Sequence, residues 1–210
     1  MVIDFKKIDK QFYQPKTKPE IIDVPEMVFI MIDGQGDPNT SADYANAVQV
    51  LYGLSYAIRM NKALTGYFDY VVPPLEGMWW HKDGGVIKDI SDKGSFAWTS
   101  MIRLPAFVHL DVFEAAKITL SKKKPELDLS AARLERFTEG LCAQIMHIGS
   151  YDNEPDTTAV LEEFITTEGL HTDFSDKRRH HEIYLGDPRK TMPDKLRTVI
   201  RYPIAKEKSQ

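Results

Sequence analysis

The chain has 210 residues, of which 42% are hydrophobic and 28% are charged, and its formal net charge is −4. This length suits one large domain or two small ones, and the composition is that of a soluble globular protein. No basic excess is left to neutralise phosphates, so we expect no direct nucleic-acid partner. The single cysteine, Cys142, excludes an intramolecular disulfide bond and a cysteine-cluster metal site.

The first half of the chain predicts an arm and then a β-α-β-β unit. Residues 1–19 are polar, contain two prolines and predict an irregular or partly helical arm. Apolar runs, a helical stripe and turn signals then predict a strand, a helix and two more strands, at residues 26–32, 41–61, 68–80 and 95–104.

The second half predicts the same order after a charged amphipathic linker helix at residues 107–124. Two strands joined by a turn at residues 138–140 come first, and a helix and two strands follow. We expect them at residues 131–137, 141–148, 157–167, 180–185 and 195–202.

Two pairs of similar segments indicate a duplication. Residues 31–37 (MIDGQGD) resemble 146–152 (MHIGSYD), and residues 102–105 (IRLP) resemble 200–203 (IRYP). A repeat that occurs only twice fits a closed pseudo-twofold pair better than a solenoid.

The predicted fold class is therefore α+β, with tandem β-α-β-β modules that form antiparallel sheets. We expect helices on one face of the sheets and a ligand cleft on the other. After the arm, residues 20–205 form a single domain with repeats at about 20–105 and 131–204.

Each repeat carries one strand glutamate, and Glu182 is the stronger candidate for chemistry. Strand alternation places His180, Glu182 and Tyr184 on one face and Ile183 with Leu185 on the other. We expect the apolar face to lie beneath the helices and Glu182 to face the cleft. A carboxylate among aromatic rings can be a general base, a cation anchor or both. The alternative is a solvent-exposed strand acid.

The counterpart in the first repeat is Glu76, which alternation places on one strand face with Met78 and Trp80. Large flat and soft side chains of this kind bind planar apolar ligands. The alternative is that Trp79 and Trp80 fill the core, and alternation suggests that each ring has one of these two roles.

Two residues near the end of the strand that opens the second repeat complete the candidate site. Tyr151 could close the cleft and donate a hydrogen bond, and His147 could be an acid–base partner, although a structural histidine is the alternative. Metal catalysis is not expected, because His180 and His181 point to opposite faces of a strand and no His-Glu-x-x-His motif is present. Residues 33–39 fit neither a calcium loop nor a dinucleotide loop.

Five segments together resemble the GyrI-like small-molecule-binding domain family, in its long stand-alone branch. They are residues 32–39, 74–80, 139–149, 180–188 and 196–201. The resemblance covers roughly residues 20–205 and implies tandem β-α-β-β modules with a ligand cleft between them. It implies that Glu182 is the functional strand glutamate and that Trp80, Tyr151 and Tyr184 are cleft aromatics.

Stand-alone members of this family are known as hydrolases of cyclopropanoid compounds, and members fused to transcription activators sense lipophilic, often cationic drugs. The resemblance implies hydrophobic aromatic small molecules as partners and no cofactor. A link to DNA gyrase rests on the family name alone. Residues 1–20 are too few for a fused helix-turn-helix.

Two functions follow from these expectations. The first is hydrolytic detoxification, in which Glu182 activates a water molecule and Tyr151 polarises a carbonyl group. The second is a drug-binding or sensor module without catalysis, in which Glu182 is the counter-charge for a cation. The N-terminal residues lack the long apolar core of a signal peptide, and no run approaches the ~18 apolar residues of a membrane helix. We therefore expect a cytoplasmic protein without a membrane partner.

Overall fold

The computed structural model describes residues 2–62, 66, 69–87 and 90–206. The described part of the chain contains strands, helices and three short 3-10 turns. In chain order the elements are β1 (Val2–Ile3), α1 (Phe5–Ile8), α2 (Lys10–Tyr13), β2 (Glu20–Gln35), α3 (Ala42–Met60), β3 (Asp69–Tyr70), β4 (Glu76–His81), η1 (Lys93–Ser95), β5 (Phe96–Leu104), α4 (Leu110–Lys123), β6 (Arg133–Ile148), η2 (Tyr151–Asn153), α5 (Glu154–Thr167), β7 (Leu170–Thr172), β8 (His180–Tyr184), η3 (Pro193–Lys195) and β9 (Arg197–Lys206).

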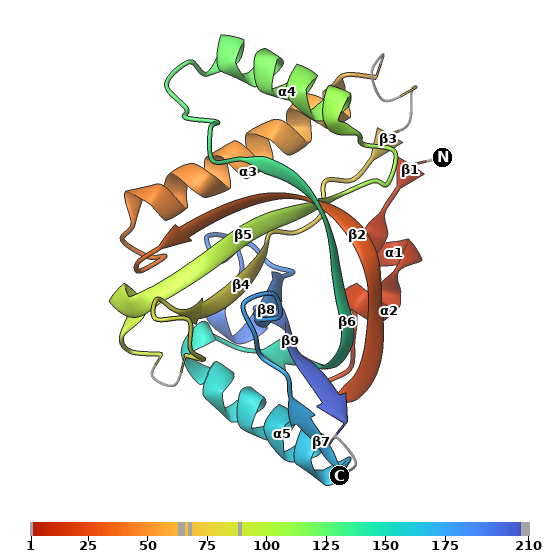
Figure 1. Ribbon diagram of the computed structural model, residues 1–210, viewed down its shortest axis with the longest axis vertical. Helices are drawn as coiled ribbons and strands as arrows, with labels where there is room; N and C mark the ends of the chain where they lie inside the picture. The colour runs from red at the N-terminus through yellow and green to blue at the C-terminus, as the bar shows by residue number, and fades with distance from the viewer. Residues whose placement is uncertain (1, 63–65, 67–68, 88–89, 207–210) are drawn as a thin grey trace.

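Six antiparallel strands form a closed ring. Their order is β6-β2-β5-β4-β8-β9, and β9 pairs with β6 to complete the circle. The long strands β2 and β6 make this possible, because each curves and pairs with one neighbour along its first part and another along its second (Figure 1). β7 is added at the end of β9, and β1 pairs with β3 in parallel. The mixed, antiparallel architecture confirms the predicted α+β class.

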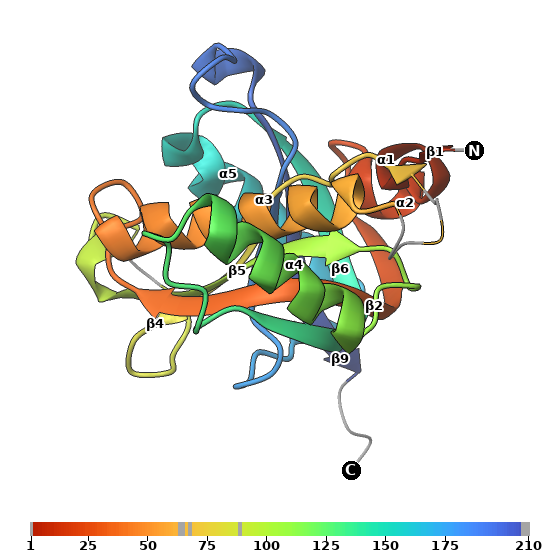
Figure 2. The ribbon, with the colours of Figure 1, turned by 90° about the horizontal axis from the view of Figure 1, so that it is seen from above.

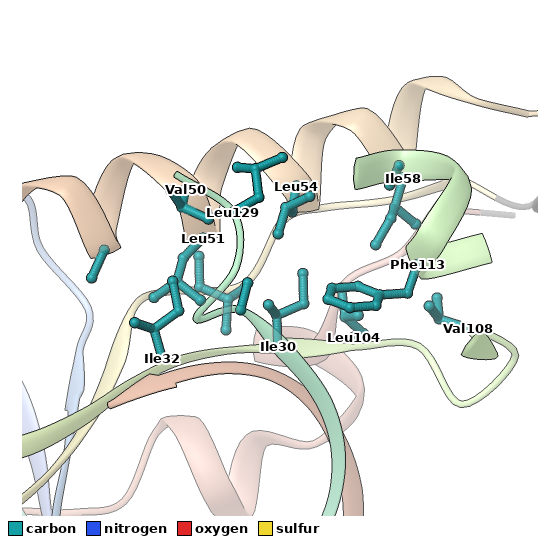
Figure 3. Close-up of a cluster of buried hydrophobic side chains, with 14 of the residues drawn as sticks. Ile30, Ile32, Val50, Leu51, Leu54, Ile58, Leu104, Val108, Phe113 and Leu129 are labelled. Atoms are coloured by element: carbon teal, nitrogen blue, oxygen red, sulfur yellow. The ribbon is translucent and has the colours of Figure 1, made fainter. Parts of the chain in front are cut away.

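The three long helices lie outside the ring, in two groups. α3 and α4 cover β2 and β5 on one side, and α5 covers β6 and β9 on the other (Figures 1 and 2). Ser41 caps the start of α3, because its side-chain oxygen accepts a hydrogen bond from the Tyr44 backbone N–H. Its buried side chains, including Leu51 and Leu54, meet Ile30 and Ile32 of β2 (Figure 3). This burial fixes the helices to the outer face of the sheet.

The inside of the ring holds a separate core to which the N-terminal arm contributes. Phe5, Phe12 and Tyr13 of α1 and α2 are buried against inward-facing side chains such as Met101 and Met146. The arm was expected to be irregular or partly helical, and it is helical over these two short segments. It therefore belongs to the folded core.

Several boundaries differ from those expected. β6 runs unbroken through the turn expected at residues 138–140, because Gly140 adopts a φ of 73° and lets the strand bend without ending. α5 begins at Glu154 and not at residue 157. The strand expected at residues 68–80 is divided into β3 and β4, and Phe68 lies outside the described residues. The linker helix is α4, within the expected range.

The element order β2-α3-β4-β5 recurs as β6-α5-β8-β9 on either side of α4, apart from the short strands β3 and β7 and the 3-10 turns. The division into repeats at about 20–105 and 131–204 stays an interpretation of this order. None of the helices in the described part of the chain combines the length and apolar character needed to cross a membrane.

Candidate functional site

Strands β4 and β8 are neighbours and divide the predicted site residues between two faces. In their antiparallel register Gly77 lies opposite Glu182. Glu76 and Ile183, one residue further along each strand, are also partners and point into the ring. The grouping by alternation is therefore correct, but the expected direction was wrong. Ile183 packs in the inner core, and Glu182 lies on the outer face, where the helices are.

The inward-facing acid, Glu76, belongs to a buried network that also contains Glu139, His181 and Arg201. One oxygen of Glu76 accepts a hydrogen bond from the Tyr13 hydroxyl at 3.1 Å, and the other lies 3.1 Å from Nε2 of His181. His181 Nδ1 is 3.1 Å from Glu139, and Arg201 Nη1 donates to Glu139 at 2.7 Å. We call these five residues, together with Gln144, the inner network.

The charges in the inner network stabilise each other. Burial alone would lower the pKa of His181, but the charge of Glu139 and hydrogen bonds to Glu139 and Glu76 outweigh this and raise it to about 9. Burial alone would raise the pKa of Glu139, but the positive charges of His181 and Arg201 lower it to about 2. At neutral pH the Glu139 carboxylate therefore faces two cations, His181 and Arg201.

The outward-facing acid, Glu182, ends a chain of hydrogen bonds. The indole N–H of Trp79 donates to the Tyr184 hydroxyl at 2.8 Å, and this hydroxyl donates to Glu182 Oε2 at 2.7 Å. Gly77 leaves room for the chain, since a Cβ there would lie 2.8 Å from Trp79 Nε1 and 3.2 Å from the Tyr184 oxygen. Glu182 Oε1 lies 2.8 Å from Nε2 of His180. The Tyr184 hydroxyl thus holds one carboxylate oxygen, while the His180 contact has an ion-pair distance without hydrogen-bond geometry.

Two more aromatic rings border this chain. The Tyr151 ring, from η2, meets the Tyr184 ring edge-to-face with centroids 5.9 Å apart. The Tyr44 ring, from α3, lies 5.9 Å from Trp79. Burial, and then the charge of Glu182, raise the pKa of Tyr184, while burial and the charges of Glu154 and Glu182 raise that of Tyr151 to about 12. These hydroxyls are therefore hydrogen-bond donors at neutral pH.

A second carboxyl group lies beside Glu182 and was not expected from the sequence. Glu154 is the first residue of α5. Burial, and then the negative charge of Glu182, raise the pKa of Glu154 above neutral. Glu154 is thus protonated at neutral pH, and the negative charge of Glu182 is one cause. We call Tyr44, Trp79, Tyr151, Glu154, Glu182 and Tyr184 the outer cluster.

The structure brings together only some of the predicted site residues. Glu182, Tyr184 and Tyr151 meet in the outer cluster. Glu76 and Met78 face into the ring. Trp80 packs at the edge of the inner core, and the Arg179 guanidinium carbon lies 4.9 Å from the centroid of the Trp80 ring. The tryptophan that joins Glu182 is Trp79 and not Trp80, because Trp79 shares the outward face with Gly77.

His147 faces outward but lies buried beside α5. Its Nδ1 is 2.8 Å from the Thr157 hydroxyl and its Nε2 is 3.0 Å from the Ser150 carbonyl oxygen. Both ring nitrogens therefore have partners in the loop and helix that follow β6. This arrangement supports the structural alternative that the sequence left open for this histidine.

The signals for the missed residues were local. Glu154 precedes Pro155, and an acid followed by proline is typical of the first helical turn.

Among the described residues, no three His, Cys, Asp or Glu side chains gather where they could hold a metal ion. The outer cluster can stack an aromatic ligand, donate hydrogen bonds from tyrosine and present one held carboxylate.

Comparisons with known proteins agree with this architecture. A family model described as the GyrI-like small molecule binding domain matches residues 17–205. Among solved structures, an uncharacterized conserved protein from Listeria innocua is 50% identical, with a TM-score of 0.92 over 97% of this chain and 100% of that chain. A hydrolase from Listeria innocua is 48% identical, with a TM-score of 0.90 over 98% and 100%.

A more distant likeness concerns the fold alone. The C-terminal domain of EcmrR is 11% identical, with a TM-score of 0.56 over 90% of this chain and 98% of that chain. A search of curated proteins gave no match. The family match spans most of the chain, and the Listeria relatives share about half of its residues. This chain therefore belongs to the GyrI-like small-molecule-binding domain family.

Proposed function

We propose that the outer cluster binds lipophilic aromatic small molecules and hydrolyses those that carry an activated cyclopropane ring. The observation that carries this proposal is the hydrogen-bonded chain from Trp79 through Tyr184 to Glu182. It holds one carboxylate oxygen among aromatic rings and fixes the orientation of the group. The name of the 48% identical relative, a hydrolase, supports hydrolysis in general and not a particular substrate.

The proposed reaction adds one water molecule across a strained bond. Glu182 takes a proton from water as the water oxygen bonds to a ring carbon. The ring C–C bond breaks, and its electron pair moves into a conjugated carbonyl group, which becomes an enolate. Protonation of the enolate gives a product that equals the substrate plus water, so no leaving group is released.

Tyr151 has a second role in this proposal. Its hydroxyl lies on the ring stacked edge-to-face against Tyr184, so it is close to the held carboxylate without being part of the hydrogen-bonded chain. A neutral phenol in that position can donate a hydrogen bond to the carbonyl oxygen as negative charge develops. Tyr44, which is partly exposed, supplies flat apolar surface for the ligand, and the buried Trp79 ring packs behind it.

One observation favours a second function, binding without turnover. The outer cluster contains two carboxyl groups among four aromatic rings, which suits a lipophilic cation held by cation–π contacts and a counter-charge. In that function Glu182 neutralises the ligand and no bond is broken.

The experiment that separates the two functions follows the mass of the ligand. The probe is a fluorescent aromatic compound whose cyclopropane ring is conjugated to a carbonyl group, incubated in large excess over protein. Hydrolysis predicts many equivalents of a product heavier by one water, and Glu182→Gln slows this by about 10²–10⁴-fold while binding persists. Glu163→Gln, an exposed acid on α5, is the matched control and keeps full turnover. Stoichiometric binding with unchanged mass would reject hydrolysis of this class.

A further inference from the structure

The second carboxyl group of the outer cluster has an unsatisfied oxygen. Glu154 Oε1 is buried and has no hydrogen-bond partner among the described residues. The Thr198 hydroxyl of β9 interacts with this carboxyl group, but its oxygen is also buried without a hydrogen bond of normal geometry among the described residues. Thr198 pairs with Tyr184 across β8 and β9. A buried polar atom without a partner destabilises the fold. Such an atom next to Glu182 points to a role in contact with a ligand.

The titratable groups that interact with Glu154 come from η1, η2, β8 and β9. Its acidic and phenolic neighbours outnumber the single cation, Lys93, which is itself 3.9 Å from Asp152. The titratable groups facing Glu154 are Lys93 of η1, Tyr151 and Asp152 of η2, Glu182 and Tyr184 of β8, and Tyr202 of β9. This balance, together with burial, keeps the pKa of Glu154 raised and the group protonated at neutral pH.

We propose that Glu154 is the catalytic proton donor of the outer cluster, which protonates the enolate oxygen formed when Glu182 directs water to the cyclopropane ring. This inference rests on the proposed function and assigns a residue to its second half. Glu182 and Glu154 then divide base and acid between two carboxyl groups, as carboxyl pairs in different environments commonly do.

The alternative donor in the cluster is the Tyr151 hydroxyl. Its pKa is raised to about 12, so it gives up a proton reluctantly and acts better by hydrogen bonding. Glu154 starts with a proton and becomes a carboxylate when it protonates the enolate, after Glu182 has become neutral. The charge of the pair is therefore unchanged. Over one turnover the water proton passes to Glu182, the Glu154 proton passes to the product oxygen, and exchange with solvent restores both groups.

The first test needs no turnover. Infrared difference spectra at neutral pH report the C=O stretch of a neutral carboxylic acid. We expect a band that Glu154→Gln removes and that the exposed control Glu163→Gln retains. Adding an unreactive aromatic ketone should lower the frequency of this band, because the Glu154 O–H then donates to the ketone oxygen. If Glu154→Gln removes no band, or the ketone binds without shifting it, the assignment is wrong.

The second test uses turnover of the cyclopropane probe. Glu154→Gln should slow the reaction by about 10²–10³-fold, with ligand affinity retained. The alkaline decline in rate that reports loss of the Glu154 proton should disappear in this variant. Full turnover with an unchanged pH profile in Glu154→Gln would overturn the inference. A wild-type protein that binds the probe without hydrating it would reject the proposed function instead, and the infrared test still decides whether Glu154 donates to a ligand.

Discussion

The inner network and the outer cluster each contain two glutamates, yet they differ in how those acids are satisfied. In the inner network Glu76 and Glu139 face His181 and Arg201, and each of these four groups has at least two hydrogen-bond partners. In the outer cluster the buried Glu154 oxygen has no partner among the described residues. Buried charges that are paired and hydrogen-bonded are typical of a structural role, whereas an acid with an unpaired oxygen among aromatic rings is a candidate for ligand binding.

The same two strands supply both regions. On β4 and β8 the inward positions hold Glu76 and His181, and the positions next to them hold Gly77 and Glu182 on the outward side. The two strand glutamates that mark the two halves of the chain therefore lie on opposite faces of one sheet. Sharing strands in this way lets the inner network hold the backbone that positions Glu182.

The largest expected effect comes from breaking the inner network. Arg201 is 2% exposed and donates hydrogen bonds to Glu139, Gln144 and the Phe12 carbonyl oxygen. Arg201→Met removes the cation and leaves a buried carboxylate short of a partner, which should cost about 3–5 kcal/mol in the free energy of unfolding. Urea denaturation measures this change.

The matched control is Arg136→Met, because Arg136 forms an exposed ion pair with Glu26 at 3.0 Å. We expect its free energy of unfolding to change by less than about 0.5–1 kcal/mol. Equal losses in the two variants would mean that the inner network does not hold the ring together.

The next effect is a dependence of stability on pH. The pKa of His181 is raised from 6.5 to about 9, so its contribution is complete below about pH 6.5 and is lost as the pH rises through 9. The pKa of Glu139 is lowered from 4.5 to about 2, so its contribution is complete above about pH 4.5 and is lost as the pH falls through 2. Each contribution is worth about 3 kcal/mol, and stability should be highest between these limits.

Urea midpoints measured across this range test the pH dependence. His181→Asn should remove the alkaline loss of stability, while His171→Asn, at an exposed position, should keep it. An alkaline loss that persists in His181→Asn would assign the effect to another group.

The smallest expected effect on stability concerns the outer cluster. In Gly77→Ala the new Cβ would lie 2.8 Å from Trp79 Nε1 and must displace the indole ring. We expect a loss of about 1–3 kcal/mol in the free energy of unfolding and weaker binding of aromatic probes, measured by fluorescence titration. Gly94→Ala has space for its Cβ and is the control. Unchanged probe affinity in Gly77→Ala would remove Trp79 from the binding surface.

Much of the site was predictable because strand alternation depends only on local sequence. It grouped Glu182 with Tyr184 and Glu76 with Met78 correctly. Which group faces the helices depends on how the ring closes, and the pairing of β6 with β9 joins residues more than 40 positions apart. No local pattern reports that closure.

The inner network was missed for a related reason. Glu139 was assigned to a turn, because Gly140 follows it, although the strand continues through both residues. Arg201 lies in an apolar strand, where a charged residue could have signalled a buried partner. The partner itself comes from a distant strand, so only the folded structure brings Glu139, His181 and Arg201 together.

The most direct measurement is turnover per folded molecule in two paired variants, Glu182→Gln and Glu76→Gln. The two glutamates lie on neighbouring strands but on opposite faces. Each substitution replaces one carboxyl oxygen with an amide nitrogen, so the chemical change is the same in both variants. We predict that Glu182→Gln loses turnover and keeps its stability, while Glu76→Gln loses stability and keeps the turnover of its folded fraction. If Glu76→Gln lost turnover while folded and Glu182→Gln kept it, the division between a structural inner network and a functional outer cluster would be contradicted.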